Sequence, residues 1–526
     1  MMEEIEEKYT DPILNITLDT LKKKKQQLVF VNTKRSAEAV AEKISTKIKE
    51  QNELWEELSK EILSVVSSPT KQCRRLSKII KKGIAFHHSG LHNKQRHLIE
   101  TEFKKGNILV ICATPTLAIG VDTPAYRVII RDTKRYGGIT GMQDIPVLEY
   151  EQQAGRAGRP KYDNCGEAII PVSSISEKEK VWHKYIKGKP EEILSKLAVE
   201  PILRTYTLSL IATDIVRNKN ELFDFMKETF YAHQYGSIEK IQEIILRILK
   251  DLVKWEMIED TITINTTDIK KIKIEDIGFS DATTYVKIED KENKERLKAT
   301  RLGKRVAELY LDPYTANYLV NCLRKTIEKG AKEFSMLQMI SNTLEMRPLI
   351  TAKQKEQEQI EEKIILEESN LLSPEPSVFS MDYQDFLHSI KTAIIFEEWI
   401  NEKTEENILE EYGVTPGELN AKIDRADWLL YASLEINKIS GRKEINNEIH
   451  KLRIRLQNGV KEELLNLLRL KGIGRVRARK LYKNKIRTTT EIKNTPKSYL
   501  ELILGKKITK DILEQITGKK IQDEKE

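Results

Sequence analysis

The chain has 526 residues, of which 39% are apolar and 32% charged, so we expect about three or four packed domains and not a disordered protein. The first ten residues are acidic and lack the features of a secretory signal, and the longest apolar run, Ile108–Ala113, is too short to span a membrane. The scattered cysteines Cys73, Cys112, Cys165 and Cys322 form no C-x-x-C pair, which favours reduced thiols in a cytoplasmic protein and argues against a zinc site.

The net charge of +8 is concentrated at one end of the chain. Residues 451–526 contain 21 Lys and Arg against 9 Asp and Glu, a net charge of +12, so residues 1–450 carry −4. Such a basic segment is typical of a protein that binds a nucleic-acid backbone. A lysine-rich surface exposed to solvent is the alternative.

Residues 1–190 alternate apolar runs with amphipathic stretches such as 33–50. This alternation predicts an α/β domain with a parallel sheet and helices on both faces. The lysines at 22–25 suit the C-terminal end of a helix before the first strand. The predicted strands are 27–32, 83–88, 108–114, 127–132 and 166–172.

The pattern changes after residue 190. Residues 191–311 contain short helices followed by an alternating stretch at 257–267, which suggests a small hairpin and a winged-helix domain. Residues 312–448 are almost wholly helical in pattern, apart from a loop at 373–377 and a break at 412–419, where Pro416 suits a first helical turn. The basic region, 449–526, forms the fourth predicted domain.

Hydroxyl and charged side chains follow two of the predicted strands. Thr33 and Lys34 come after the first strand, and Thr114 and Thr116 come after the third. The same loop continues to Gly120 and Asp122. Because ligands bind at the carboxyl edge of such sheets, we expect these residues to lie at one binding edge.

The segment "QQAGRAGRP", residues 152–160, carries two arginines, Arg156 and Arg159, each directly after a glycine. Arginine stays ionised and offers planar donors to phosphate, while glycine permits a tight turn. Phosphoryl transfer depends on neutralising charge on the γ-phosphate oxygens. The pattern therefore predicts arginines that act on a nucleotide, with surface ion pairs as the alternative.

The segments "FHHSGLHNKQRHLIETEFKKGNILVICATPTLAIGVDTPA" and "EYEQQAGRAGRP" resemble motifs IV, V and VI in the second RecA-like motor domain of Ski2-like superfamily 2 helicases. Two further segments, "ATRLGKRVAELYLDPYTA" and "LLRLKGIGRVRARKLY", extend the resemblance to the archaeal HelQ-type repair branch, over nearly the whole chain and in the same domain order. The resemblance implies an ATP-dependent DNA helicase that moves 3′ to 5′ along single-stranded DNA.

The resemblance also assigns roles to residues. It implies that Gln152, Arg156 and Arg159 contact ATP, and that Gly120 and Asp122 couple nucleotide to nucleic acid, although many relatives have asparagine where Asp122 stands. The residues that it places near the tracked strand are Thr33, Lys34, Thr114, Thr116, His88 and Gly90. For His88 a purely structural role is the alternative.

Between motifs V and VI, Gly137-Gly138 predicts the turn of a hairpin, with Arg135 and Tyr136 before it. In the family a hairpin here separates the duplex, so Tyr136 is expected to stack on a base pair. A plain surface loop is the alternative.

The stretch 419–436 resembles the family's ratchet helix, in which Arg425 and Trp428 share a face toward the strand. Relatives often carry a basic residue where this chain has Ala421, beside Lys422, and a core position for Trp428 remains the alternative. Trp399 is expected in the core.

The sequence around Gly472 and Gly474 predicts a helix-hairpin-helix module. Its exposed backbone amides, with Arg475, Arg477 and Arg479 nearby, would hold phosphates without reading the sequence. A simple turn between helices is the alternative.

The sequence contains neither G-x-x-x-x-G-K-[ST] nor D-E-x-[HD], the motifs that hold ATP and Mg²⁺ in these motors. We therefore expect a second polypeptide to supply the first motor domain, most of the ATP site and Mg²⁺. A shortened form of a longer protein would have the same sequence. A non-catalytic nucleic-acid-binding remnant and an RNA unwindase are the alternative functions.

Overall fold

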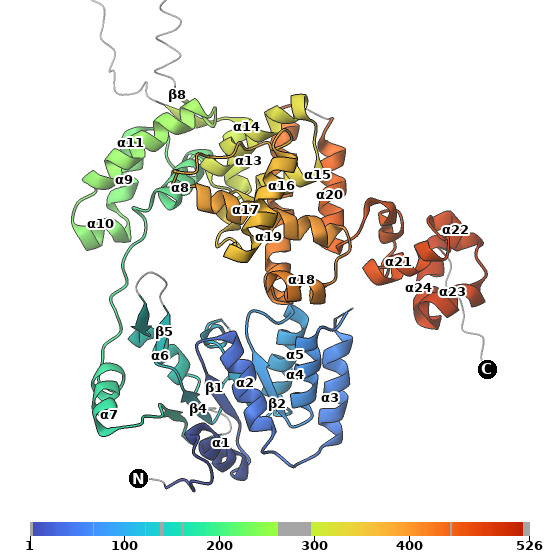
Figure 1. Cartoon of the computed structure of the whole chain (residues 1–526). Coiled ribbons are helices and arrows are strands. Elements are labelled where there is room, and N and C mark those ends of the chain that lie inside the picture. The colour runs from blue at the N-terminus through green and yellow to red at the C-terminus, as the bar shows by residue number, and fades with distance from the viewer. Residues whose placement is uncertain are drawn as a thin grey trace, which may run out of the picture. The chain divides into compact units, whose positions relative to one another are not determined.

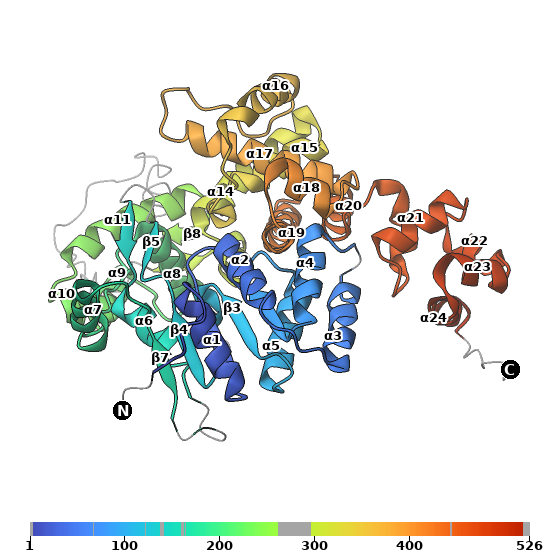
Figure 2. The same cartoon turned by 60° about the horizontal axis from the view of Figure 1, so that its bottom comes forward.

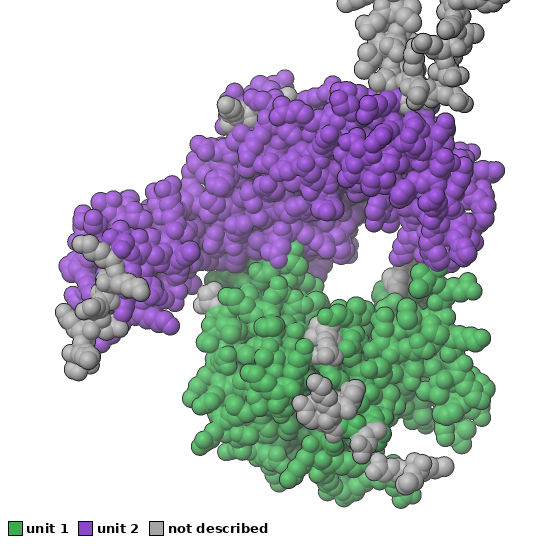
Figure 3. Space-filling model, turned by 180° about the vertical axis from the view of Figure 1, so that it is seen from behind, with its two compact units in different colours: residues 1–193, 404–421 green, residues 194–403, 422–526 purple. Residues whose placement is uncertain are grey.

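The computed structural model describes residues 4–66, 68–120, 123–136, 141–158, 163, 165–260, 296–441 and 444–518. The chain divides into two compact units, coloured separately in Figure 3. Unit 1 comprises residues 1–193 and 404–421, and unit 2 comprises residues 194–403 and 422–526. Within the described ranges, we find no helix with the length and apolar character needed to cross a bilayer.

Unit 1 is built on a five-stranded sheet in the order β2-β3-β1-β4-β7, and every pairing in it is parallel. Figure 1 labels β1, β2 and β4 of this sheet, and Figure 2 labels β3, β4 and β7. The central strand, β1, pairs Val29 with Cys112 on one side and with Ile129 on the other. The predicted strands and their parallel arrangement are thereby confirmed. The strands are β1 (Gln27–Phe30), β2 (Ile84–His87), β3 (Val110–Ala113), β4 (Arg127–Ile130) and β7 (Glu167–Ile169).

Helices flank this sheet (Figures 1 and 2). Side-chain caps explain where several of them begin: Asp11 accepts a hydrogen bond from the Ile13 amide, and Thr33 accepts one from the Ser36 amide. The predicted lysine-rich helix end before β1 is confirmed, because α1 ends at Lys22. The helices are α1 (Pro12–Lys22), α2 (Lys34–Ser45), α3 (Glu53–Ser64), α4 (Lys71–Ile80), α5 (Asn93–Lys104), α6 (Val147–Ala154) and α7 (Ile175–Val181).

Residues 404–421 also belong to unit 1, although they lie far from it in the chain. They comprise α18 (Glu405–Tyr412) and the start of α19 (Pro416–Ile439). From Lys422 onward, α19 belongs to unit 2. As predicted, Pro416 occupies the first turn of this helix.

Unit 2 is mainly helical, and its only described strands form an antiparallel pair, β8 (Ile258–Asp260) with β9 (Leu297–Ala299). A strand at the start of 257–267 is therefore present, but β9 is its partner, and the turn predicted within 257–267 lies outside the described residues. As predicted, the segment 373–377 is a loop. The first helices of unit 2 are α8 (Glu200–Ala212), α9 (Lys219–Lys227), α10 (Phe230–Tyr235), α11 (Glu239–Lys254) and α13 (Arg301–Glu308).

The helical stretch that follows contains Trp399, which is 8% exposed and donates its indole N–H to the Leu456 carbonyl, so its core position is confirmed. The last helices share a separate apolar core that includes Leu464, Leu481 and Ile512. The remaining helices of unit 2 are α14 (Pro313–Lys329), α15 (Glu333–Ser341), α16 (Gln357–Glu367), α17 (Tyr383–Ile400), α20 (Asn446–Asn458), α21 (Arg475–Lys483), α22 (Thr489–Asn494), α23 (Lys497–Leu504) and α24 (Lys506–Thr517).

A buried arginine ties three elements of unit 1 together at the amino end of β4. The Arg127 side chain is 0% exposed and forms ion pairs with Asp19 of α1 at 2.8 Å and Glu167 of β7 at 2.6 Å. Burial alone would raise the pKa of both carboxyls. Hydrogen bonds from Arg127 and Lys23 hold the pKa of Asp19 below its ordinary value, and hydrogen bonds from Tyr126 and Arg127 do the same for Glu167.

We predict that Arg127→Met destabilises the chain by about 3 kcal/mol, because it removes the buried cation that Asp19 and Glu167 share. Urea unfolding followed by circular dichroism measures the loss. Lys43→Met is the matched control: it removes a cation from a solvent-exposed pair with Asp11, which is worth about 1 kcal/mol or less. Equal unfolding midpoints for the two variants would contradict the prediction.

The same ion pairs predict a pH dependence. A carboxyl whose pKa is lowered in the folded state stabilises the fold above its ordinary pKa, about 4 for Asp and Glu. This contribution is lost as the pH falls through the lowered pKa values of Asp19 and Glu167. The difference in unfolding free energy between the wild type and Arg127→Met should therefore shrink as the pH falls from about 5 to about 2. A constant difference over this range would refute the assignment.

Candidate nucleotide and nucleic-acid sites

The loops after β1, β2 and β3 all leave the sheet at its carboxyl edge, because the strands are parallel. Thr33 is exposed there as the cap of α2, and the Thr114 and Thr116 hydroxyls lie 3.0 Å apart after β3. Lys34 forms an ion pair with Glu418. The fold thus brings the predicted residues of these loops to one edge, with Lys34 engaged by a residue distant in sequence.

The "GRAG" turn is joined by backbone bonds to the segment that follows motif V. The Ala125 amide donates to the Arg156 carbonyl at 2.9 Å, and the Gly158 amide donates to the Ala125 carbonyl at 2.7 Å. The resulting parallel bridge pairs Ala125 with Ala157. Gly158 has φ of +94°, which favours glycine, so this turn depends on the residue type that the motif provides.

The bridge fixes where Arg156 lies. Its guanidinium donates from Nε and Nη2 to the Ala118 carbonyl, at 3.1 and 2.5 Å. Ala118 ends the 3₁₀ turn Pro115–Ala118 after β3, so motif VI contacts motif V directly. The side chain is half-buried, and its donors lie at the edge that carries Thr114 and Thr116.

The other residues predicted to contact the nucleotide are Gln152, Gly120, Asp122 and Arg159. Gln152 is exposed on α6, whereas the adjacent Gln153 is 1% exposed. Gly120 is exposed with φ of +77°. Asp122 and Arg159 lie outside the described residues. Among the described residues, no group of three or more His, Cys, Asp or Glu side chains is placed to hold a metal ion.

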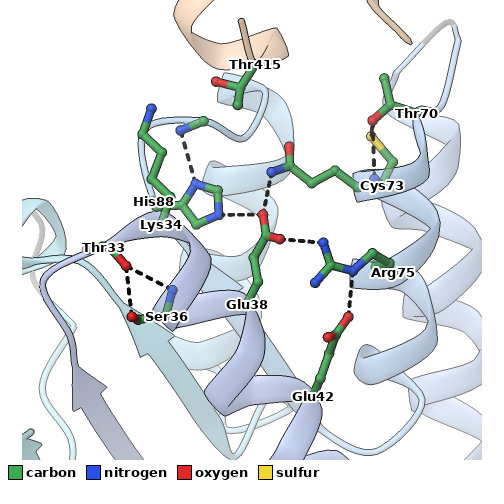
Figure 4. A network of polar contacts seen from close by, with 12 residues as sticks. Thr33, Lys34, Ser36, Glu38, Glu42, Thr70, Cys73, Arg75, His88 and Thr415 are labelled. Atoms are coloured by element: carbon green, nitrogen blue, oxygen red, sulfur yellow. Dashed lines mark hydrogen bonds and ion pairs between the residues drawn. The ribbon is translucent and has the colours of Figure 1, made fainter. Parts of the chain in front are cut away.

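The loop after β2 is held by a buried polar network that the sequence did not suggest (Figure 4). The Gly90 amide donates to His88 Nδ1 at 3.1 Å, and His88 Nε2 lies 3.2 Å from the Glu38 carboxylate. This pattern assigns the ring proton to Nε2. Both ring nitrogens are thus bonded within the protein, which supports the structural role for His88.

Glu38 is the centre of this network and also contacts Gln72 and Arg75. Burial would raise the pKa of the Glu38 carboxyl, but the hydrogen bonds from His88 and Gln72 and the nearby Arg75 charge keep it below its ordinary value. The network joins α2 and α4 to the loop after β2, so it fixes the position of that loop at the sheet edge.

The start of α19 is seated on the same loop. The Gly417 amide donates to the Gly90 carbonyl at 3.0 Å, and a Cβ at Gly417 would lie 2.1 Å from the Ser89 carbonyl oxygen. Only glycine fits there. Glu418 accepts from the Thr415 amide at 3.0 Å, a capping contact that the spacing in "TPGE" could have revealed.

The predicted hairpin between motifs V and VI is confirmed: β5 (Lys134–Tyr136) pairs antiparallel with β6 (Met142–Asp144). Its predicted turn, Gly137-Gly138, lies outside the described residues. Tyr136 is 74% exposed and pairs with the exposed Met142. Arg135 forms an ion pair with Glu149 of α6 at 2.7 Å, which links the hairpin to the motif VI helix.

The predicted face of the ratchet helix contacts protein backbone in unit 2. Arg425 is exposed and donates to the Arg347 carbonyl at 2.6 Å, and the half-buried Trp428 donates to the Leu309 carbonyl at 3.2 Å. Lys422 is buried and donates to the Met346 carbonyl at 2.5 Å. Only part of the Trp428 ring is therefore available for stacking.

Near the C-terminus, the exposed Gly472 has φ of +89°, and Gly474 directly precedes α21. Arg477 is exposed and donates to the Gly472 carbonyl at 2.8 Å. Arg475 lies over the Trp399 ring, 4.7 Å from its centroid, and Arg479 forms an ion pair with Glu402. The three arginines are thus not equivalent: Arg475 and Arg479 hold this region to the helices of unit 2.

Comparison with known proteins agrees with this geometry. Residues 10–161 match the model of the helicase conserved C-terminal domain, and residues 334–459 match that of archaeal helicase, domain 4. The chain is 39% identical over 510 residues to the ATP-dependent DNA helicase Hel308 of Pyrococcus horikoshii. It is 37% identical to the proteins of the same name from Pyrococcus abyssi, over 515 residues, and Methanococcus vannielii, over 521 residues.

These alignments cover 95%, 96% and 96% of this chain, and 65%, 66% and 67% of the three relatives in the same order. The chain therefore spans about two thirds of the length of the curated relatives that it matches. With this identity and coverage, the chain belongs to the Hel308-like family of Ski2-type superfamily 2 helicases.

Proposed function

We propose that this chain is the C-terminal part of an ATP-dependent helicase that moves 3′ to 5′ along single-stranded DNA and opens forks. The observation that carries the proposal is the placement of Arg156, tethered to the loop after β3 at the carboxyl edge of the sheet. Similarity to proteins named ATP-dependent DNA helicases supports it. The four unpaired thiols agree with the cytoplasmic location that we also propose.

In this proposal the ATP site is composite. The P-loop and the carboxylates that hold the triphosphate and Mg²⁺ lie outside this sequence, on a second polypeptide or on another part of a longer protein, since neither motif occurs in it. Arg156 and Arg159 would enter from this chain and neutralise charge that develops on the γ-phosphate, and Gln152 would contribute a further polar contact. ATP hydrolysis supplies the free energy for movement. This chain supplies the arginine charges at the γ-phosphate and the sheet edge that contacts the strand.

The remaining domains receive proposed roles on the same basis. We assign a second RecA-like motor domain to residues 1–190, a winged-helix domain to 191–311, a ratchet domain to 312–448 and a helix-hairpin-helix domain to 449–526. Tyr136 would act at the duplex junction, where its 74% exposed ring is free to stack on a base pair. The loop amides near Gly472 and Gly474, with Arg477, would hold the DNA backbone.

We expect the chain alone to hydrolyse ATP at background rate. Adding a P-loop motor-domain chain from a Hel308-like helicase, together with single-stranded DNA, should restore turnover, measured by phosphate release. In that mixture Arg156→Ala should lower turnover by about 10³-fold or more, the usual effect of removing an arginine finger.

Lys78→Ala removes an exposed cation from α4 and serves as the control, with turnover unchanged. DNA affinity, measured by fluorescence anisotropy, should be the same for all three proteins. Full turnover with Arg156→Ala would instead favour a non-catalytic nucleic-acid-binding protein. Stronger unwinding of RNA forks than of DNA forks would favour an RNA unwindase.

We further predict that Gly417→Ala uncouples hydrolysis from unwinding, because its methyl group cannot fit beside the Ser89 and Leu91 carbonyl oxygens. Displacing the start of α19 should lower fork unwinding by up to about a hundredfold, as misplacement far from the chemistry can do. DNA-stimulated ATP turnover should persist. Lys78→Ala, an exposed substitution on α4, is again the control. Normal unwinding by Gly417→Ala would exclude this coupling route.

A further inference from the structure

A cleft of about 380 Å³ lies in unit 2 between α13 and the C-terminal end of α19, at a place to which the sequence assigned no ligand. Two helices supply its charged lining: Arg301, Lys304, Arg305 and Glu308 from α13, and Glu435 and Lys438 from α19. Four cations thus face two carboxylates, an excess of positive charge in a concave site of a size that holds small ligands.

Both carboxylates are already engaged by two of the four cations. Arg305 forms ion pairs with Glu308 at 2.7 Å and Glu435 at 2.8 Å, and Lys438 forms one with Glu435 at 2.8 Å. Arg305 also donates to the Tyr431 hydroxyl at 3.1 Å. These contacts fasten α13 to α19 and fix the shape of the cleft, but they leave its excess charge unbalanced.

That excess belongs to Arg301 and Lys304. Both side chains are exposed, and within the part of the chain that the structure describes neither forms a hydrogen bond or an ion pair. They lie three residues apart on α13, so they project from the same side of that helix. Two uncompensated cations on one wall of a concave site are suited to a compact anion.

The cleft extends the side of α19 that carries Trp428. Glu435 follows Trp428 by seven residues and Lys438 follows Tyr431 by seven, an interval of about two turns that brings each side chain back to the same side of the helix. From Arg425 to Lys438 the helix rises about 20 Å. An extended strand along this face would therefore reach the cleft at its C-terminal end.

We propose that this cleft binds a phosphodiester group of single-stranded nucleic acid, with Arg301 and Lys304 as its ligands and Arg305 as a positioning residue. The inference rests on the proposed function, because it takes the tracked strand as the source of the phosphate. Free phosphate shares the same chemistry and is the other possible source of the anion.

The test compares two double variants of the full chain. Arg301→Ala/Lys304→Ala removes the proposed ligands, and Arg324→Ala/Lys355→Ala removes the same charges from exposed positions elsewhere in unit 2. Affinity for a labelled single-stranded oligonucleotide is measured by fluorescence anisotropy over a salt series. Loss of the one phosphate contact that these two cations share should lower the slope of log K against log salt by about 0.7, and the affinity roughly fivefold at about 0.1 M salt.

A second arm shows whether one particular linkage occupies the cleft. Oligonucleotides with a single neutral methylphosphonate are scanned along the strand. One position should weaken wild-type binding, and that penalty should vanish in the Arg301→Ala/Lys304→Ala variant but persist in the control variant. Inorganic phosphate at millimolar concentration should not displace the strand; if it does so only with the wild type, free phosphate is the ligand and the inference is overturned.

The outcomes separate this inference from the proposed function. If the wild type does not bind single-stranded DNA at all, the proposed function fails. If the wild type binds and the two double variants show the same slope and affinity, the cleft inference alone fails. Circular dichroism melting of both variants confirms that any loss of affinity occurs in folded protein.

Discussion

Strand β1 hydrogen-bonds in parallel with β3 on one side and with β4 on the other, and all four of its residues are buried. A strand buried in this way cannot reverse its direction or shift its register without exposing apolar side chains or losing ladder bonds. The loops after β1, β2 and β3 are therefore held at one edge of the sheet. That edge carries Thr33, Thr114 and the loop of Gly90.

The arrangement also explains how two motifs distant in sequence act as one element. Ala125 follows the motif V loop and bridges to Ala157 in the motif VI turn, while Arg156 reaches back to the Ala118 carbonyl. The turn is thus fixed by backbone bonds, and the Arg156 guanidinium is fixed by the Ala118 carbonyl. A side chain that is already fixed in this way loses little conformational entropy when it binds a phosphate. Because of these bonds, the loop after β3 and the motif VI turn move together. The proposed response of Arg156 to a nucleotide requires this coupling.

Residues 404–421 show that sequence order and structural grouping differ in this chain. They lie within the helical region of the sequence, yet they pack with the sheet of unit 1, where Gly417 contacts Gly90 and Glu418 pairs with Lys34. Helix α19 begins in this segment and continues as part of unit 2. Its two ends thus serve different purposes: the first turn is fixed by contacts with the sheet edge, and the last turns line the basic cleft with α13.

The sequence by itself determined the parallel α/β sheet, the hairpin of β5 and β6, the helical character of the second half and the motifs at the sheet edge. These features depend on local periodicity, on glycine positions and on residue order, all of which can be read from short stretches of the sequence. The same motifs carry the resemblance to the helicase family.

Only the tertiary structure decided which partners each polar side chain takes. Lys34, expected at the strand, pairs with Glu418; His88 contacts Glu38; and Arg475 stacks on Trp399. The cleft formed by α13 and α19 joins residues more than 120 positions apart, as the Arg305–Glu435 pair shows. Such contacts depend on packing between elements distant in the chain, and neither spacing nor composition carries that information.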